Sequence, residues 1–324
     1  GGGTGLCGQT TNVAIVMDHS KYFTNILELN AEEKWARVQP GVILDELRDK
    51  AEKHHLTYGP DPATHTHCTL GGMIGNNSCG VHSIMAGKTV DNIITMDVVT
   101  YDGIRLTVGE TTEEELTEFC SRKDRVGEIY RAMRDIRDSS SANIKAIYPD
   151  IPRRVSGYNL DQLLPKNKFN GARALVGSEG TLITVLEAKV RLVHSPPART
   201  LVIMGYPDVY QAGDHVPEVL ATGPIGLEGI DDQLVGFMKK KGMYVQYLHM
   251  LPKGGGWLLV EFGGDTKVES DAKAMKCMAK LKLERNPPNM KLYDHEEAEK
   301  EVWKMRESGL GATANVPGMA LAWP

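Results

Sequence analysis

The sequence lacks three features that would point to particular classes of protein. No segment is strongly basic, no uninterrupted apolar run approaches the length of a membrane span, and no signal peptide is visible. With a formal net charge of −5 there is no positive field to attract nucleic acid. We therefore expect a cytoplasmic protein without a transmembrane segment or nucleic-acid partner. Attachment to the inner face of the membrane and homo-oligomerisation stay open.

Cysteine is also scarce, and its spacing is uninformative about metals. The five cysteines are odd in number and contain no CxxC pair, which fits a reducing compartment and argues against both a disulfide framework and an iron–sulfur site within this stretch. His65, His67 and Cys68 lie close together but lack the second pair of a usual zinc site. We expect no metal site. The cysteines are Cys7, Cys68, Cys79, Cys120 and Cys277.

The length of 324 residues suggests two domains. Two prolines in the segment 195–199 would end a strand and stiffen a linker, which predicts domains over 1–196 and 197–324. The chain has no initiator Met and starts inside a glycine motif. We interpret it as a fragment whose first domain is truncated at its N-terminus and whose second domain is truncated at its C-terminus.

Hydrophobic patterning indicates an α+β protein. Alternating strand and helix patterns follow residue 200 and end in a helix over Glu296–Glu307. An Asp102-Gly103 turn predicts a hairpin between Ile93–Tyr101 and Ile104–Val108. In the first part we also expect strands over Val13–Met17, Ile26–Leu29, Trp35–Val42, Arg173–Gly177 and Leu182–Val193, a helix over Ile43–His54, and a loop from Tyr58 to Gly80.

The opening segment Gly3–Gly8 has the GxGxxG spacing, which alone is a weak signal. A Rossmann site requires a helix directly after the glycines, whereas the strand-like Val13–Met17 follows here. A glycine-dense turn between strands can still bind phosphate through successive backbone N–H groups. The alternative interpretation is an ordinary tight turn.

The polar loop from Tyr58 to Gly80 is the second candidate. Prolines rigidify Gly59–Thr64, and glycines in Thr69–Gly80 permit close backbone approach. The amides of Asn76 and Asn77 suit a pyrophosphate or the edge of a flavin. Loops of this length are uncommon unless they are functional, although a surface loop is the simpler alternative.

Four segments occurring in order carry a family resemblance: Gly1–Gln9, Gly59–Thr64, Thr69–Gly80 and Gly177–Leu182. Together they resemble the FAD-linked oxidases with a flavin domain of the vanillyl-alcohol-oxidase or PCMH type. Further strings at 156–161, 227–231 and 302–307 are similar to large bacterial flavin and iron–sulfur proteins related to D-2-hydroxyglutarate and D-lactate dehydrogenases. The resemblance implies a PCMH-type FAD-binding domain followed by a ferredoxin-like α+β substrate or cap domain.

The resemblance also implies which residues line the FAD. No His lies between Gly1 and Asp18, so we expect non-covalent FAD. Ile183 stands where the family usually has Gly. The implied cofactor residues are Gly1, Gly2, Gly3, Thr4, Gly5, Leu6, Gly8, Gln9, Pro60, Asp61, Thr64, Thr69, Gly71, Gly72, Gly75, Asn76, Asn77, Gly80, Glu179, Gly180 and Ile183.

An enzyme that acts on a 2-hydroxy acid must bind the substrate carboxylate. The planar guanidinium of Arg is best suited to this role, because it can donate two parallel hydrogen bonds to a carboxylate. The resemblance places Arg306 in this role, and Tyr158, Asn159, Arg153 and Arg154 are weaker candidates. Alternatively, Arg306 is a helix arginine paired with a nearby Glu, and Arg153–Arg154 is a solvated turn.

The catalytic residues remain unknown, because the family's metal motif and its Glu-His pair do not occur in this sequence. The base or divalent metal that activates the substrate hydroxyl is expected beyond Pro324. An iron–sulfur domain is expected there as well. This chain is therefore expected to bind FAD and turn over poorly.

The implied function is oxidation of a D-2-hydroxy acid, of the D-2-hydroxyglutarate or D-lactate type, to the 2-oxo acid by hydride transfer to FAD. Electrons would pass through the iron–sulfur domain to an unknown acceptor. Two alternatives remain: an oxygen-using flavin alcohol oxidase, and an FAD-binding module without catalysis.

Overall fold

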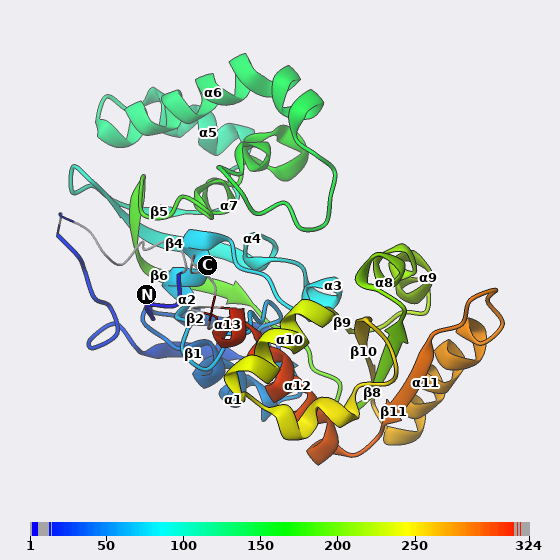
Figure 1. The fold of residues 1–324 in the computed structure, drawn as a ribbon. Helices are drawn as coiled ribbons and strands as arrows, with labels where there is room; N and C mark the ends of the chain where they lie inside the picture. Colours follow the sequence, from blue (N-terminus) through cyan, green and yellow to red (C-terminus); the bar gives the residue numbers. More distant parts are fainter. Residues whose placement is uncertain (1, 6–12, 14, 314–315, 317, 319–324) are drawn as a thin grey trace. The chain divides into compact units, whose positions relative to one another are not determined.

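The computed structural model describes residues 2–5, 13, 15–313, 316 and 318. Contacts divide the chain into two compact units, Gly1–His194 and Ser195–Pro324, hereafter unit 1 and unit 2. Each unit combines helices with an antiparallel sheet, so the α+β class is confirmed (Figure 1). Within the described ranges, no helix is both long and apolar enough to cross a membrane.

The sheet of unit 1 has five antiparallel strands in the order β1-β2-β6-β4-β5. The predicted hairpin is confirmed, because β4 and β5 pair directly and Gly103 of their turn has a φ of +82°. A small second sheet joins β3 to β7. The strands are β1 (Ile26–Asn30), β2 (Trp35–Val38), β3 (Leu56–Thr57), β4 (Ile93–Thr100), β5 (Arg105–Val108), β6 (Ile183–Arg191) and β7 (Val193–His194).

The core of unit 1 lies between this sheet and the helices that follow β2. Leu44, Leu47 and Ala51 form the buried face of α1, and Leu70, Met73 and Ile74 form that of α2. A smaller cluster packs under the pair α5 and α6. The helices are α1 (Leu44–Glu52), α2 (Leu70–Asn76), α3 (Ser83–Ala86), α4 (Thr89–Asn92), α5 (Glu113–Ser121), α6 (Arg125–Ile147) and α7 (Gly171–Leu175), with 3₁₀ turns η1 (Leu160–Leu163) and η2 (Pro165–Asn167).

Three of the expected elements in unit 1 were wrong. The described residues of Val13–Met17 form no strand, and their apolar side chains are exposed. β-Branched residues favour a strand only where their side chains pack against neighbours, and these side chains do not. The expected strand over Arg173–Gly177 is instead α7, which begins where the Asn170 side chain accepts from the Arg173 N–H. The expected loop contains α2, because Thr69 caps the Gly72 N–H and burial outweighs the low helix propensity of glycine.

Unit 2 is built on a four-stranded antiparallel sheet in the order β11-β8-β10-β9. Helices cover both of its faces, so successive residues of β10 point into two different hydrophobic cores. Leu259 belongs to one core and Val260 to the other. The strands are β8 (Ala198–Tyr206), β9 (Gly226–Asp231), β10 (Gly256–Gly264) and β11 (Asn289–Tyr293).

Helices α8 and α11 pack on the Val260 face, and α10 and α12 pack on the Leu259 face. The helix over Glu296–Glu307 has the bounds that its sequence predicts. The helices are α8 (Val209–Asp214), α9 (Val216–Leu220), α10 (Asp232–Lys241), α11 (Lys267–Leu281), α12 (Glu296–Glu307) and α13 (Gly309–Thr313), with a 3₁₀ turn η3 (Val245–Met250).

Candidate cofactor site

The opening glycine segment lies against the polar loop of unit 1. A Cβ atom added to Gly2 would stand 2.0 Å from the carbonyl oxygen of His67, so only glycine permits this approach. Gly3 has a φ of +70° and open space around its Cβ position. Thr4 and Gly5 are partly buried. Of the implied cofactor residues, Gly1, Leu6, Gly8 and Gln9 lie outside the described residues.

A buried ion pair ties the Gly59–Thr64 turn to the end of the Thr69–Gly80 loop. Asp61 accepts the backbone N–H of His82 at 2.9 Å, and its other carboxylate oxygen lies 2.5 Å from Nδ1 of His82. Burial by itself raises the pKa of Asp61, but the charge and hydrogen bonds of His82, together with the charge of Arg48, hold this pKa below its ordinary value. Gly80 packs on the same turn, where an added Cβ would stand 1.9 Å from the carbonyl oxygen of Asp61.

The Gly177–Leu182 segment binds to α2 through its backbone. Gly177 donates to the Ile74 carbonyl at 2.8 Å, and Glu179 donates to the Gly75 carbonyl at 3.1 Å. Gly177, Glu179 and Gly180 all have positive φ, which makes a tight turn. Glu179 and Gly180 are exposed. The third and fourth segments of the resemblance therefore form one structural unit.

Asn77 carries a buried donor that has no partner among the described residues. It ends α2 in the left-handed conformation, with a φ of 53°. Its Oδ1 accepts the Val90 N–H at 3.0 Å, whereas Nδ2 is buried and bonds to no described atom. Buried amide donors are rarely left unpaired. This Nδ2 is therefore suited to an acceptor oxygen of a bound group.

The other implied cofactor residues of unit 1 have more varied surroundings. Pro60 is buried, and the carbonyl oxygen of Thr64 accepts the N–H groups of His67 and Cys68. Gly71 packs on Pro40, where an added Cβ would stand 2.6 Å from a ring carbon. Asn76 is exposed. The side chain of Ile183 belongs to the hydrophobic core at the start of β6.

Two contacting residues were missed by the sequence analysis. His82 is 8% exposed and pairs with Asp61. The hydroxyl of Tyr101 donates to the Gly180 carbonyl at 2.5 Å. This hydrogen bond links the β4–β5 turn to the Glu179–Gly180 turn. Neither residue lies in a recognisable motif, although Tyr101 directly precedes the Asp-Gly turn signal.

Four of the substrate candidates lie in unit 1, and three of them have structural contacts. Arg154 pairs with Asp161 at 2.7 Å and lies over the ring of Tyr148. Asn159 is 1% exposed and donates to the Val176 carbonyl at 2.7 Å. The hydroxyl of Tyr158 lies 2.8 Å from that of Thr181. Arg153 is exposed. Tyr158 and Asn159 therefore lie beside the turn that contacts α2.

The fifth substrate candidate, Arg306, lies on α12 of unit 2. Its Nη2 is 3.1 Å from Oε1 of Glu228 on β9, and its side chain is 22% exposed. The Nε atom is buried and has no hydrogen-bond partner in the described part of the chain. Arg306 therefore pairs with a Glu from another element, and it retains donor capacity for a carboxylate ligand.

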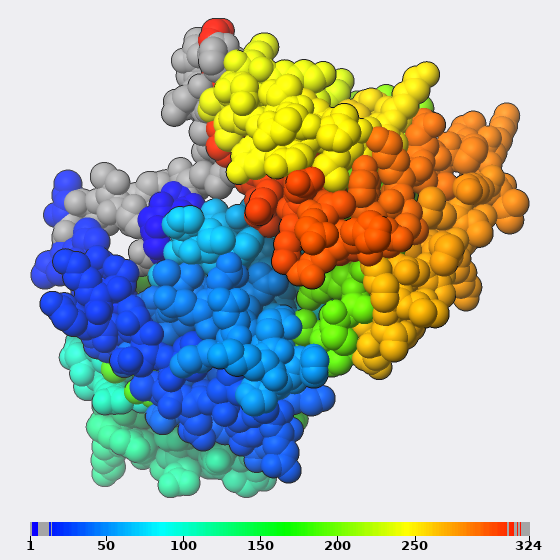
Figure 2. All heavy atoms as spheres, turned by 90° about the horizontal axis from the view of Figure 1, so that it is seen from below, coloured from blue at the N-terminus to red at the C-terminus, as the bar shows by residue number. Residues whose placement is uncertain are grey.

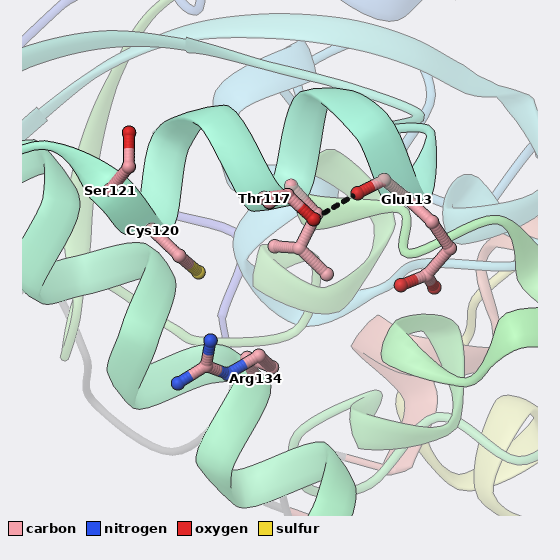
Figure 3. Close-up of a pocket in the computed structure, with 6 residues that line it drawn as sticks. Glu113, Thr117, Cys120, Ser121 and Arg134 are labelled. Carbon is pink, nitrogen blue, oxygen red and sulfur yellow. Dashed lines mark hydrogen bonds between the residues drawn. The ribbon is translucent and has the colours of Figure 1, made fainter.

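A shallow pocket of about 290 Å³ lies elsewhere in unit 1, between α5 and α6 (Figure 3). It is lined by Glu113, Leu116, Thr117, Cys120, Ser121 and Arg134. Figure 3 shows the Arg134 guanidinium and the Cys120 thiol on facing helices, with Thr117 bonded to the Glu113 carbonyl. None of these residues belongs to the four segments, so the pocket is separate from the candidate site.

The residues present fit a dinucleotide cofactor such as FAD. The site combines one unpartnered buried amide at Asn77 with backbone turns at Gly3 and Gly180, where no atom would contact an added Cβ. Such turns leave room for a ligand and present backbone N–H groups to phosphate oxygens. These features come from segments far apart in the sequence.

Two protein-family models match the chain. The FAD binding domain matches residues 1–109, and the C-terminal domain of FAD linked oxidases matches residues 195–323. The chain belongs to the FAD-linked oxidases. The PCMH-type FAD-binding domain followed by an FAD-linked oxidase C-terminal domain is thereby confirmed.

Individual relatives agree with this family. A Pseudomonas putida protein named D-2-hydroxyglutarate dehydrogenase is 32% identical over 98% of this chain and 32% of its own length. An Archaeoglobus fulgidus protein named D-lactate dehydrogenase is 29% identical over 74% of this chain and 43% of its own. The solved structure of an alkyldihydroxyacetonephosphate synthase covers 90% of this chain and 45% of its own, with a TM-score of 0.55 and 18% identity, which shows a shared fold. This FAD-linked oxidase chain thus spans about a third of the length of the Pseudomonas relative.

Proposed function

We propose that this FAD-linked oxidase chain binds FAD non-covalently through unit 1 and serves the oxidation of a D-2-hydroxy acid to the 2-oxo acid. The observation that carries the FAD proposal is the packing of the Gly177–Leu182 turn against the end of α2 at Asn77, whose buried Nδ2 lacks a partner among the described residues. The substrate class rests on the names of relatives and on Arg306. D-2-hydroxyglutarate and D-lactate are the candidate substrates.

FAD, when bound, supplies the acceptor for the hydride that leaves C2 of the hydroxy acid. The chain itself would hold the cofactor with the N–H groups of Gly3 and Gly180 and with the Asn77 amide. The ion pair of Asp61 and His82 would keep two of the cofactor segments in contact. Rigid support of this kind is what precise placement of a reactive group requires.

Arg306 would bind the substrate carboxylate. Its guanidinium has five N–H donors, and its ion pair with Glu228 is formed through Nη2. The buried, unpartnered Nε supports the proposal, because a carboxylate bound to Nε and an Nη atom would satisfy it. Tyr158 and Asn159 are secondary candidates, and the contacts of Asn159 favour a role in holding the loop.

We further infer that electrons leave the flavin through an iron–sulfur domain, with an acceptor of unknown identity. The support is the resemblance to large flavin and iron–sulfur proteins. The described part of the chain contains no group of three or more His, Cys, Asp or Glu side chains that could hold a metal ion.

The experiment is anaerobic mixing of the FAD-loaded chain with D- and L-2-hydroxyglutarate, D-lactate and L-lactate, followed by visible absorbance. We expect a D-2-hydroxy acid to perturb and then slowly bleach the flavin spectrum, whereas the L enantiomer does not. Retention of FAD without a response to any hydroxy acid would contradict the dehydrogenase role and favour a cofactor-binding module. Bleaching by simple alcohols and fast reoxidation by oxygen would favour an alcohol oxidase.

A further inference from the structure

Helix α12, which carries Arg306, contacts the sheet of unit 2 through a row of polar side chains. Glu299, Trp303 and Arg306 are separated by four and three residues, so they lie on one face of the helix. The opposite face is solvated. Figure 2 shows the orange-red helix exposed on its outer side, where Glu296, Glu297, Lys300 and Lys304 are exposed.

Each member of this row has a partner from a different element. Trp303 donates its indole N–H to Oε1 of Glu261 on β10 at 3.1 Å. Arg306 pairs with Glu228 on β9 at 3.1 Å, and Glu299 lies 3.5 Å from Nζ of Lys267 at the start of α11. The helix is thereby fixed at three points along its length.

The strand register places the sheet partners opposite α12. Glu261 pairs with Leu201 of β8, Leu259 pairs with Glu228 of β9, and Leu201 and Leu259 belong to the core beneath α12. Side chains paired across neighbouring strands share a face of the sheet, so Glu261 and Glu228 face the same helix.

Glu261 is the centre of this arrangement. It is 2% exposed, and its two carboxylate oxygens have different partners: Oε1 accepts from Trp303, and Oε2 lies 3.2 Å from Nη1 of Arg199. A carboxylate this deeply buried is costly unless it is fully paired. Sliding or rotating α12 would remove the indole N–H from Glu261, so the pairing favours one register of the helix.

The start of β8 shows how Lys267 reaches this cluster. β11 pairs with β8 from Leu201 to Gly205, so Arg199 lies on this strand before the pairing with β11 begins. The ammonium of Lys267 donates to the Arg199 carbonyl and, at 3.0 Å, to the Thr200 hydroxyl. From this position Lys267 also reaches Glu299 on α12.

We propose that Glu261 and Trp303 are positioning residues that hold α12 in the register in which Arg306 can bind the substrate carboxylate. This inference rests on the proposed role of Arg306. Neither residue contacts the substrate. Their effect passes through the helix, because Trp303 and Arg306 are one turn apart on the same face.

The test uses Trp303→Phe, which keeps a large ring and removes the N–H that Glu261 accepts. Its matched control is Trp257→Phe. Trp257 is a buried residue of β10 in the same core, but its indole N–H donates to the Pro252 carbonyl at 2.8 Å and not to a residue linked to α12. Each variant loses one indole hydrogen bond, part-buried for Trp303 and buried for Trp257, so the thermal stability of both is measured alongside ligand binding.

The readouts are the dissociation constant of D-2-hydroxyglutarate and the limiting rate of flavin reduction, both measured anaerobically on the FAD-loaded chain, together with the FAD dissociation constant. We expect Trp303→Phe to weaken hydroxy acid binding about tenfold and to leave FAD binding unchanged. The limiting rate should change much less. Trp257→Phe should bind the hydroxy acid like the wild type.

A second pair of variants keeps the proposal testable if Trp303→Phe does not fold. Glu261→Gln retains a carbonyl oxygen for the indole N–H, and Glu261→Leu does not, so the Gln variant should bind the hydroxy acid more tightly than the Leu variant. Equal binding by these two, or equal losses in Trp303→Phe and Trp257→Phe, would overturn the proposal.

Arg306→Leu separates this proposal from the one on which it rests. If Arg306→Leu weakens hydroxy acid binding and Trp303→Phe does not, Arg306 binds substrate and the positioning role is wrong. If Arg306→Leu has no effect on binding, the proposed role of Arg306 fails, and the positioning role fails with it.

Discussion

Asp61 and His82 form a buried ion pair in which Oδ2 and Nδ1 lie 2.5 Å apart and the His82 N–H donates to Oδ1. The two residues are 9% and 8% exposed. They join residues 21 positions apart, one from the Gly59–Thr64 turn and one from the segment that follows Gly80. The pair therefore ties the Gly59–Thr64 turn to the chain just after the Thr69–Gly80 loop, where Gly80 also packs on Asp61.

Breaking this pair should weaken both folding and FAD binding. Removing one partner of a buried pair typically lowers the free energy of unfolding by ~3 kcal/mol. We expect His82→Ala to show such a loss, measured by urea denaturation, and a roughly tenfold rise in the FAD dissociation constant. Asp45→Asn is the control, because its pair with His65 at 2.7 Å is more exposed. Equal effects of the two substitutions would contradict a special role for Asp61 and His82.

The same pair predicts an acid-sensitive contribution to stability. The folded pKa of Asp61 lies below its ordinary value of 3.8, so its stabilising effect is present above that value and is lost as the pH falls through the folded pKa. Asp61→Asn should therefore lower the free energy of unfolding most near neutral pH, and the difference in this free energy from wild type should shrink in acid. A difference that does not change with pH would rule out this linkage.

Asn77→Asp tests the unpartnered amide directly. The substitution keeps an oxygen for the Val90 N–H, and Asp tolerates the left-handed conformation, but the buried donor becomes an acceptor. We expect FAD binding, measured by calorimetry, to weaken at least about tenfold. Asn30→Asp is the matched control, because Asn30 also accepts a backbone N–H through Oδ1, from Glu33, and lies outside the cofactor segments. Unchanged FAD affinity in Asn77→Asp would show that this amide does not contact the cofactor.

Glu299 predicts the opposite pH dependence in unit 2. Burial raises the pKa of its carboxyl to about 7 from 4.5, against the lowering effect of Lys267 and with a further rise from Glu261. Because the folded pKa is raised, the stabilising effect is fully present below 4.5 and is lost as the pH rises through about 7.

Glu299→Gln removes this titration. Relative to wild type, the variant should gain ~1–3 kcal/mol in the free energy of unfolding as the pH increases across that window. Glu296→Gln, an exposed change three residues earlier on α12, should show no comparable shift. Parallel pH profiles for wild type and Glu299→Gln, measured by denaturation, would contradict a raised pKa.

The sequence predicted elements well where local patterns and packing agree. The bounds of α12 follow from its amphipathic spacing, and the β4–β5 hairpin follows from the Asp102-Gly103 turn. Prediction failed where tertiary contacts decide. Helix α2 contains three glycines, yet it forms because its apolar face is buried and Gly71 packs closely on Pro40.

The family motifs indicated the cofactor segments, but not how those segments are held. The Asp61–His82 and Trp303–Glu261 contacts join residues 21 and 42 positions apart, and no local spacing specifies such pairs. The Asn170 cap before α7 was a usable signal, since Asn at this position favours a helix start over the strand that was expected. Arg306 was identified by resemblance alone, and its pairing with Glu228 is a finding of the structure.

The central claim is that unit 1 binds FAD, and calorimetric titration of the flavin-free chain with FAD tests it most directly. We predict saturable binding of one FAD per chain, accompanied by a change in the flavin visible spectrum. Binding should be much weaker in Asn77→Asp and unchanged in Asn30→Asp. A folded chain that neither carries flavin when purified nor binds added FAD would contradict the claim.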